Sequence, residues 1–135
     1  MGGVCVKQYL LDTHALIFWR HRIDVSEKFI DFFDLQARKG NLFCSTINFW
    51  EIALLNKKGR IEIADVEQWH ADLQAFASLH TITPSAVEMI SSVALPDFHK
   101  DPFDRLLIAQ ARHHSMTLVS KDALVAQYDV QTIWL

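Results

Sequence analysis

The chain has 135 residues, of which half are hydrophobic and 21% are charged, so it can fold as one domain around a buried core and is not a disordered protein. Its formal net charge of −3 argues against a domain that holds nucleic acid through a general basic excess. If the chain binds nucleic acid, local basic residues or a bound cation must offset its acids.

The sequence gives no indication of export, of membrane insertion or of structural disulfides. No apolar run approaches the roughly 20 residues of a membrane span, and the N-terminus lacks the pattern of a signal peptide. Cys5 and Cys44 are far apart and form no C-x-x-C motif. We therefore expect a cytoplasmic protein with reduced thiols. The seven histidines lack the spacing of a zinc site.

The hydrophobic pattern predicts short strands that alternate with helices along a single domain of residues 1–135, after a lead-in at residues 1–8. This alternation indicates an α/β fold with a mostly parallel central sheet covered on both faces. Strands are expected in the apolar run that ends at Leu11 and at 42–44, 81–83, 116–119 and 132–135; helices are expected at 15–19, 26–39, 47–58, 65–76, 85–93 and 102–111, with a short helix from 120.

The helix predicted from Pro102 carries an acid on its buried face. Asp101 is suited to the N-cap, and proline at the first helical position loses no hydrogen bond. Asp104 shares one helical stripe with Leu107, Ile108 and Ala111, which should face the interior. A carboxylate on an inward face must be paired, metal-bound or protonated, because an isolated buried charge is too costly.

Three further acids are expected at the same end of the sheet as Asp104. Asp12 directly follows the first strand, and Asp122 lies three residues after Val119. Glu51 falls within the apolar stripe of the helix from Ile47. Ligands of parallel sheets bind outside the carboxyl ends of the strands, and clustered carboxylates need a counter-charge. Mg²⁺ or Mn²⁺ would supply it, and such a site supports phosphodiester hydrolysis.

Each acid also has a purely structural interpretation. Asp12 and Asp122 can be helix caps or turn formers, and Asp104 can be the N3 partner of a capping box. Glu51 can pair with a lysine such as Lys58. The hypothesis of a metal site depends on the convergence of all four acids.

Four stretches of the chain resemble the motifs of the PIN-domain family, and more closely the VapC-type toxins of bacterial type II toxin–antitoxin pairs. The resemblance runs in the right order from Tyr9 to Leu135, and the third stretch is the most specific. The stretches are 9–16 (YLLDTHAL), 50–53 (WEIA), 101–111 (DPFDRLLIAQA) and 118–122 (LVSKD).

The resemblance implies a three-layer α/β/α domain with Mg²⁺- or Mn²⁺-dependent endoribonuclease activity. It also implies a homodimer and neutralisation by a small antitoxin protein. Carried over residue by residue, it assigns the catalytic metal-site acids to Asp12, Glu51, Asp104 and Asp122, with supporting hydroxyls at Thr13 and Ser120. Asn48 departs from the serine that related toxins often have there.

Three basic residues are candidates for contacts with RNA phosphates. Arg105 and Lys121 each adjoin one of the acids, and Lys58 belongs to a small basic run just after the Glu51 helix. A solvated charged face is the alternative interpretation. Two other functions also stay open: a PIN nuclease of RNA processing that is not a toxin, and a catalytically inactive PIN fold used for binding.

Overall fold

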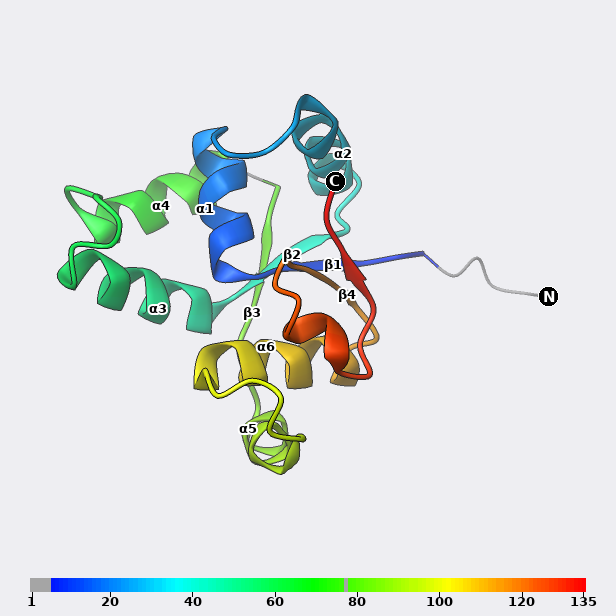
Figure 1. Cartoon of the computed structure of the whole chain (residues 1–135). Coiled ribbons are helices and arrows are strands. Elements are labelled where there is room, and N and C mark those ends of the chain that lie inside the picture. The colour runs from blue at the N-terminus through cyan, green and yellow to red at the C-terminus, as the bar shows by residue number, and fades with distance from the viewer. Residues whose placement is uncertain (1–5, 77) are drawn as a thin grey trace.

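Five short strands form one parallel sheet in the order β3-β2-β1-β4-β5. The computed structural model describes residues 6–76 and 78–135, and Figure 1 shows helices on both sides of the sheet. The expected three-layer α/β fold is confirmed. The strands are β1 (Tyr9–Leu11), β2 (Leu42–Ser45), β3 (His80–Ile82), β4 (Thr117–Val119) and β5 (Thr132–Ile133).

Six α-helices and one 3-10 helix cover the described part of the sheet. In Figure 1, α1, α2 and α4 lie on one side of the sheet, and α5 and α6 lie on the other. The helices are α1 (Thr13–His21), α2 (Glu27–Arg38), α3 (Thr46–Lys57), α4 (Val66–Phe76), α5 (Ala86–Ala94), α6 (Pro102–His113) and the 3-10 helix η1 (Val125–Gln127).

The alternation of side chains along β1 divides the core into two clusters. Tyr9 and Leu11 point to the cluster that contains α1 and α2, whereas Leu10 points to the cluster that contains α6. All three side chains are buried, because helices cover both faces of a parallel sheet. This burial explains why the first strand reads as a continuous apolar run rather than as an alternating one.

Side-chain caps fix where the helices next to the sheet begin. Asp12, Ser45 and Asp101 each accept a hydrogen bond from a backbone N–H in the first turn of α1, α3 and α6 respectively. In α3 the side chain of Asn48 completes a capping box with Ser45. The caps therefore fix where α1 and α3 begin after the strands β1 and β2, and where α6 begins after the loop that follows α5.

The segment after β4 differs from the expected helix at residue 120. The Ser120 hydroxyl accepts a hydrogen bond from the N–H of Asp122, and the Asp122 carboxylate accepts one from the N–H of Leu124. These local bonds favour a turn over a helix. Regular structure resumes only at η1, so Asp122 lies on a turn at the edge of the sheet.

The remaining differences concern lengths and the ends of the chain. α1 begins at Thr13 and extends to His21, beyond the predicted 15–19, and β5 is shorter than the predicted 132–135. Residues 6–8 lead into β1 without regular structure, and Cys5 with the rest of the predicted lead-in lies outside the described residues. Among the helices of the described ranges, none is long and apolar enough to span a membrane.

Candidate active site at the carboxyl edge of the sheet

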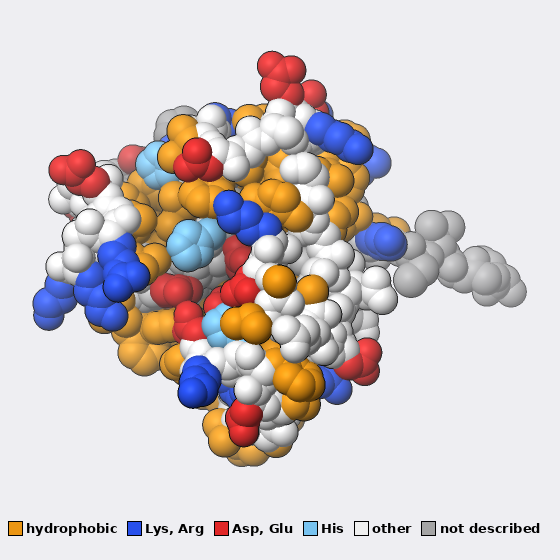
Figure 2. All heavy atoms as spheres, in the orientation of Figure 1, with side chains coloured by type: hydrophobic (Ala, Val, Ile, Leu, Met, Phe, Trp, Pro, Cys, Tyr) orange, Lys and Arg blue, Asp and Glu red, His pale blue; other side chains and the backbone are white. Residues whose placement is uncertain are grey.

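A cavity of about 620 Å³ opens where the carboxyl ends of β1 and β4 meet α3 and α6. Its position agrees with the rule that open parallel sheets bind ligands where the strand order reverses. Figure 2 shows acidic side chains gathered in a hollow on this face, with histidines beside them. The lining consists of five acids, two histidines, two aromatic residues and a lysine: Asp12, Glu51, Asp101, Asp104, Asp122, His14, His99, Phe18, Trp134 and Lys121.

Asp12 is held at the floor of the site by its role as the N-cap of α1. Its Oδ1 accepts a hydrogen bond from the N–H of Ala15 at 2.7 Å, and the residue is only 8% exposed. Burial raises the pKa of Asp12 above its usual value, although the bonds from Ala15 and Ser120 oppose that shift. Asp12 is therefore both a helix cap and a carboxylate that pays a desolvation cost for its charge.

The Glu51 side chain is held at the cavity by hydrogen bonds that involve the first turns of α1 and α3. The Thr13 hydroxyl donates to Glu51 Oε1 at 2.5 Å and accepts from the Asn48 side-chain amide at 3.0 Å. Burial raises the pKa of Glu51, and the nearby charges of Asp101 and Asp12 raise it further. Thr13 thus orients Glu51, and Asn48, the departure from the family pattern, orients Thr13.

Asp104 has the most perturbed carboxyl group of the cavity. The Asp101 cap and Pro102 start α6 so that Asp104 lies in its first turn, on the stripe that also carries the buried Leu107 and Ile108. Burial, followed by the charges of the other four acids, raises the pKa of Asp104 from 3.8 to about 8. The protein holds this acid where its ionisation is costly unless a cation is present.

Asp122 and Lys121 enter the cavity from the turn after β4. The Asp122 side chain is 38% exposed, and its charge contributes to the raised pKa of both Asp12 and Asp104. The Lys121 ammonium lies over the rings of Phe18 and Trp134, at 5.1 and 5.5 Å from their centroids. A cation is thereby held at the rim of an otherwise acidic hollow.

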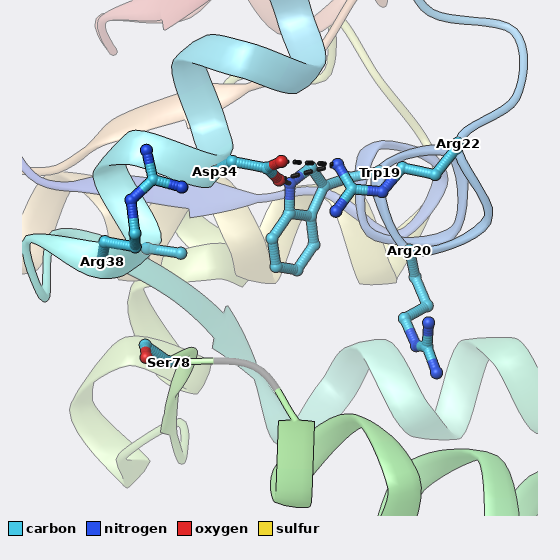
Figure 3. A pocket seen from close by; sticks show the side chains of 7 residues that line it. Trp19, Arg20, Arg22, Asp34, Arg38 and Ser78 are labelled. Carbon is cyan, nitrogen blue, oxygen red and sulfur yellow. Dashed lines mark hydrogen bonds and ion pairs between the residues drawn. The ribbon is translucent and has the colours of Figure 1, made fainter.

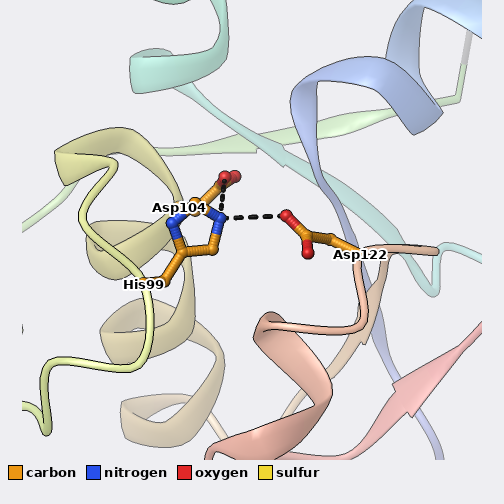
Figure 4. Close-up of side chains that lie close together, drawn as sticks. All are labelled: His99, Asp104 and Asp122. Atoms are coloured by element: carbon orange, nitrogen blue, oxygen red, sulfur yellow. Dashed lines mark hydrogen bonds and ion pairs between the residues drawn. The ribbon is translucent and has the colours of Figure 1, made fainter.

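His99 belongs to the site although the sequence reasoning missed it. Its Nε2 lies 2.9 Å from Asp104 Oδ2 and 2.9 Å from Asp122 Oδ2, as Figure 4 shows. His99 belongs to the loop between α5 and α6, and the hydrophobic periodicity of helices and strands does not describe a loop. The one available signal was that His99 lies two residues before the Asp101 cap.

The structure does not support Arg105 as a contact for RNA phosphates. Arg105 is only 9% exposed, and its guanidinium is already engaged within the protein. It donates to four backbone carbonyls at the end of α5 and in the α5–α6 connection, and to one hydroxyl: Val93, Leu95, Pro96, His99 and Tyr128. Neighbouring residues of a helix point about 100° apart, so Arg105 turns away from the cavity that Asp104 faces.

Lys58 lies apart from the residues that line the cavity. It is exposed as the C-cap of α3, two turns beyond Glu51. Of the three basic candidates, Lys121 is therefore the one that the structure places at the acids.

The donor set of the cavity fits a hard divalent cation. Asp104 and Asp122 each offer a carboxylate oxygen beside His99 Nε2, and these three atoms lie within 4.8 Å of one another. Asp12 and Glu51 add carboxylate oxygens whose pKa values are raised by burial and by neighbouring acids. Oxygen-rich sites of this kind suit Mg²⁺ or Mn²⁺, and a cation would relieve the mutual repulsion of the acids.

A second cavity of about 270 Å³ lies between α1 and α2 and has the opposite character. Figure 3 shows Asp34 directed at Trp19 and Arg22, with Arg20 and Arg38 nearby. The Asp34 carboxylate accepts from the Trp19 indole N–H at 2.9 Å and from the Arg22 guanidinium at 2.7 and 2.9 Å. The acid in this cavity is already neutralised by protein groups.

Comparisons with known proteins agree with this geometry. The sequence profile of the PIN domain family matches residues 9–131. Over 118 residues the chain is 34% identical to Ribonuclease VapC22 of Mycobacterium tuberculosis, covering 84% of this chain and 85% of that protein.

Two solved structures share the fold at low sequence identity. VapBC2 from Rickettsia felis, bound to a DNA fragment from its promoter, has a TM-score of 0.70 at 20% identity and covers 94% of this chain and 98% of its own. DNA-bound VapBC from Salmonella typhimurium has a TM-score of 0.67 at 15% identity, with 95% and 98% covered.

Proposed function

This chain belongs to the PIN domain family, and on that premise we propose that it is a metal-dependent endoribonuclease that acts as the toxin of a toxin–antitoxin pair. The observation that carries the proposal is the acid-lined cavity, in which three carboxyl groups have raised pKa values. The ribonuclease activity named for the relative at 34% identity gives the reaction class.

We propose that Asp12 and Asp104 bind the cation directly, and that Glu51 and Asp122 complete the site and help to orient the attacking water. When bound, Mg²⁺ or Mn²⁺ supplies positive charge at the scissile phosphate and lowers the pKa of a bound water. Lys121 holds a phosphate of the RNA at the rim of the cavity. Thr13 and Ser120 keep two carboxylates oriented, since the Thr13 hydroxyl donates to Glu51 and the Ser120 side chain is hydrogen-bonded to Asp12.

The partners in this proposal are RNA, a small antitoxin protein and a second copy of the chain, all in the cytoplasm. The VapBC complexes among the fold neighbours support a protein antitoxin. The exposed apolar residues of α5, with Val87, Ile90 and Val93 between 60% and 79% exposed, support an interface such as that of a homodimer.

The test is cleavage of a mixed RNA pool by the purified chain with Mn²⁺, with Mg²⁺ and with EDTA, alongside Asp104→Asn. We expect cleavage that needs the cation and falls roughly 100-fold or more in the variant, which loses one anionic ligand. Asp31→Asn, which removes an exposed acid of α2, is the control and should cut at the wild-type rate.

Cleavage by Asp104→Asn at the wild-type rate would contradict the four-acid site. Two other outcomes separate the alternatives. Metal-dependent cleavage without toxicity on expression would indicate RNA processing rather than a toxin. A folded chain that binds RNA but does not cut it would indicate a PIN fold used for binding.

A further inference from the structure

His99 is fixed more firmly than a histidine that merely lines a cavity. Its backbone N–H donates to the Tyr128 hydroxyl at 2.8 Å, and its carbonyl accepts from the Arg105 guanidinium at 3.0 Å. Tyr128 and Arg105 are themselves buried and also hold the carbonyl of Pro96, at 2.6 and 2.9 Å. The loop before α6 is therefore built around two buried side chains that set the position of the His99 ring.

The surroundings of the ring also determine which nitrogen carries the proton. His99 Nδ1 accepts a hydrogen bond from the backbone N–H of Asp101 at 3.1 Å, so Nδ1 has no proton of its own. The proton then lies on Nε2, which faces the two carboxylates. A protonated Nε2 has no lone pair to offer a metal ion, so His99 in this arrangement is a hydrogen-bond donor and not a ligand.

The single Nε2–H lies between two acids of the site. The Nε2 atom is hydrogen-bonded to Asp122 Oδ2 at 2.9 Å and also lies 2.9 Å from Asp104 Oδ2, and these two acids come from different elements, the turn after β4 and α6. Each carboxylate oxygen has two lone pairs, so it can accept this bond and still bind a cation. The histidine thus connects two acids that would otherwise repel each other.

We propose that His99 is a positioning residue that orients the carboxylates of Asp104 and Asp122 for the cation and raises the affinity of the site for it. Hydrogen-bond donors behind metal-binding side chains commonly have this effect. The inference rests on the proposed metal site and adds to it a residue that approaches the acids from the loop before α6.

The test is the affinity of the purified chain for Mn²⁺, measured by isothermal titration calorimetry in wild type, His99→Phe and His99→Gln. Phenylalanine keeps a flat ring but removes the N–H, so we expect Mn²⁺ binding to weaken by about 10- to 100-fold. Glutamine keeps an N–H donor and should restore most of the affinity. The control is His113→Gln, which changes an exposed histidine at the other end of α6 and should bind Mn²⁺ as wild type does.

Equal or tighter Mn²⁺ binding by His99→Phe would overturn the proposal, because it would show that the Nε2–H of His99 does not help the acids to bind the cation. Pulsed electron paramagnetic resonance of Mn²⁺ bound to wild type gives a second readout that does not require the phenylalanine variant to fold. A nitrogen coupling typical of a directly bound imidazole would also overturn the proposal, and its absence is expected.

The inference and the proposed nuclease fail in different measurements. If the wild type binds Mn²⁺ but cuts no RNA, the nuclease is contradicted, and weaker binding by His99→Phe still supports the positioning role. If the wild type cuts RNA and His99→Phe binds Mn²⁺ unchanged, the nuclease stands and the role of His99 is wrong.

Discussion

Asp34 and Asp104 are both helical aspartates that are largely withdrawn from solvent, with side chains 27% and 19% exposed, yet their surroundings are opposite. Asp34 accepts hydrogen bonds from an arginine and a tryptophan, so its charge is compensated within the protein. Asp104 faces four other acids, and burial together with these acids raises its pKa to about 8. A compensated acid stabilises the fold, whereas uncompensated acids gathered in one cavity support the proposed cation site.

The largest effect that should separate the two regions is the response of stability to pH without metal. Folding raises the pKa of Asp104 from 3.8 to about 8. Between pH 4 and pH 8, Asp104 is therefore protonated in the folded chain and ionised in the unfolded chain. The free energy of unfolding should therefore fall by roughly a few kcal/mol as pH rises through this window.

Urea unfolding in EDTA at a series of pH values measures this slope, with Asp104→Asn as the comparison. The variant should show a smaller slope because it lacks the Asp104 carboxyl group. Some slope should remain, since the pKa values of Asp12 and Glu51 are also raised. Adding Mn²⁺ should stabilise the wild type most at high pH, where the acids are ionised. A wild type that gains stability with rising pH over this window contradicts the raised pKa of Asp104.

A second prediction concerns Arg105, which supports the site from behind. Arg105→Lys replaces a fork of donors with one ammonium that cannot serve the carbonyls on both sides, so several buried acceptors lose their partner. We expect a loss of about 3 kcal/mol in the free energy of unfolding, measured in urea. Arg112→Lys, at an exposed position of the same helix, is the control. If both variants unfold at the same urea concentration, Arg105 does not hold the loop.

The smallest effect is expected at Asp34. Asp34→Asn weakens the bonds to Trp19 and Arg22, but Arg22 is half-exposed and such pairs contribute little in water. We expect the free energy of unfolding to fall by about 1 kcal/mol, and by less at high salt, because salt already screens this ion pair. RNA cleavage should be unchanged. Thermal unfolding at two salt concentrations checks the first part. A large loss of cleavage would mean that the two regions are coupled.

The sequence predicted the elements and the four acids because both follow from local rules. Apolar runs and caps located the strands and helices, and the positions of Asp12 and Glu51 follow from a strand end and a helical stripe. The same local reasoning was wrong for Arg105, since adjacency to Asp104 in the chain does not place two side chains on the same face of a helix.

His99 could not be predicted by those rules. Its position depends on a loop whose shape is set by Tyr128, 29 residues further along the chain, and on close polar contacts with acids of two different elements. Periodicity describes neighbours along a helix or strand, but it carries no information about such tertiary contacts. The convergence of the four acids was thus predictable from the sequence, and the histidine that lies between two of them was not.

The order in which the acids occur along the chain has a consequence for synthesis on the ribosome. The cavity takes its acids from residues 12, 51, 101, 104 and 122, and β4, which comes just before the last of them, pairs directly with β1 at the centre of the sheet. A nascent chain that has not yet reached Asp122 lacks one acid and the strand beside Asp12. The cavity therefore cannot be complete before Asp122 has been made.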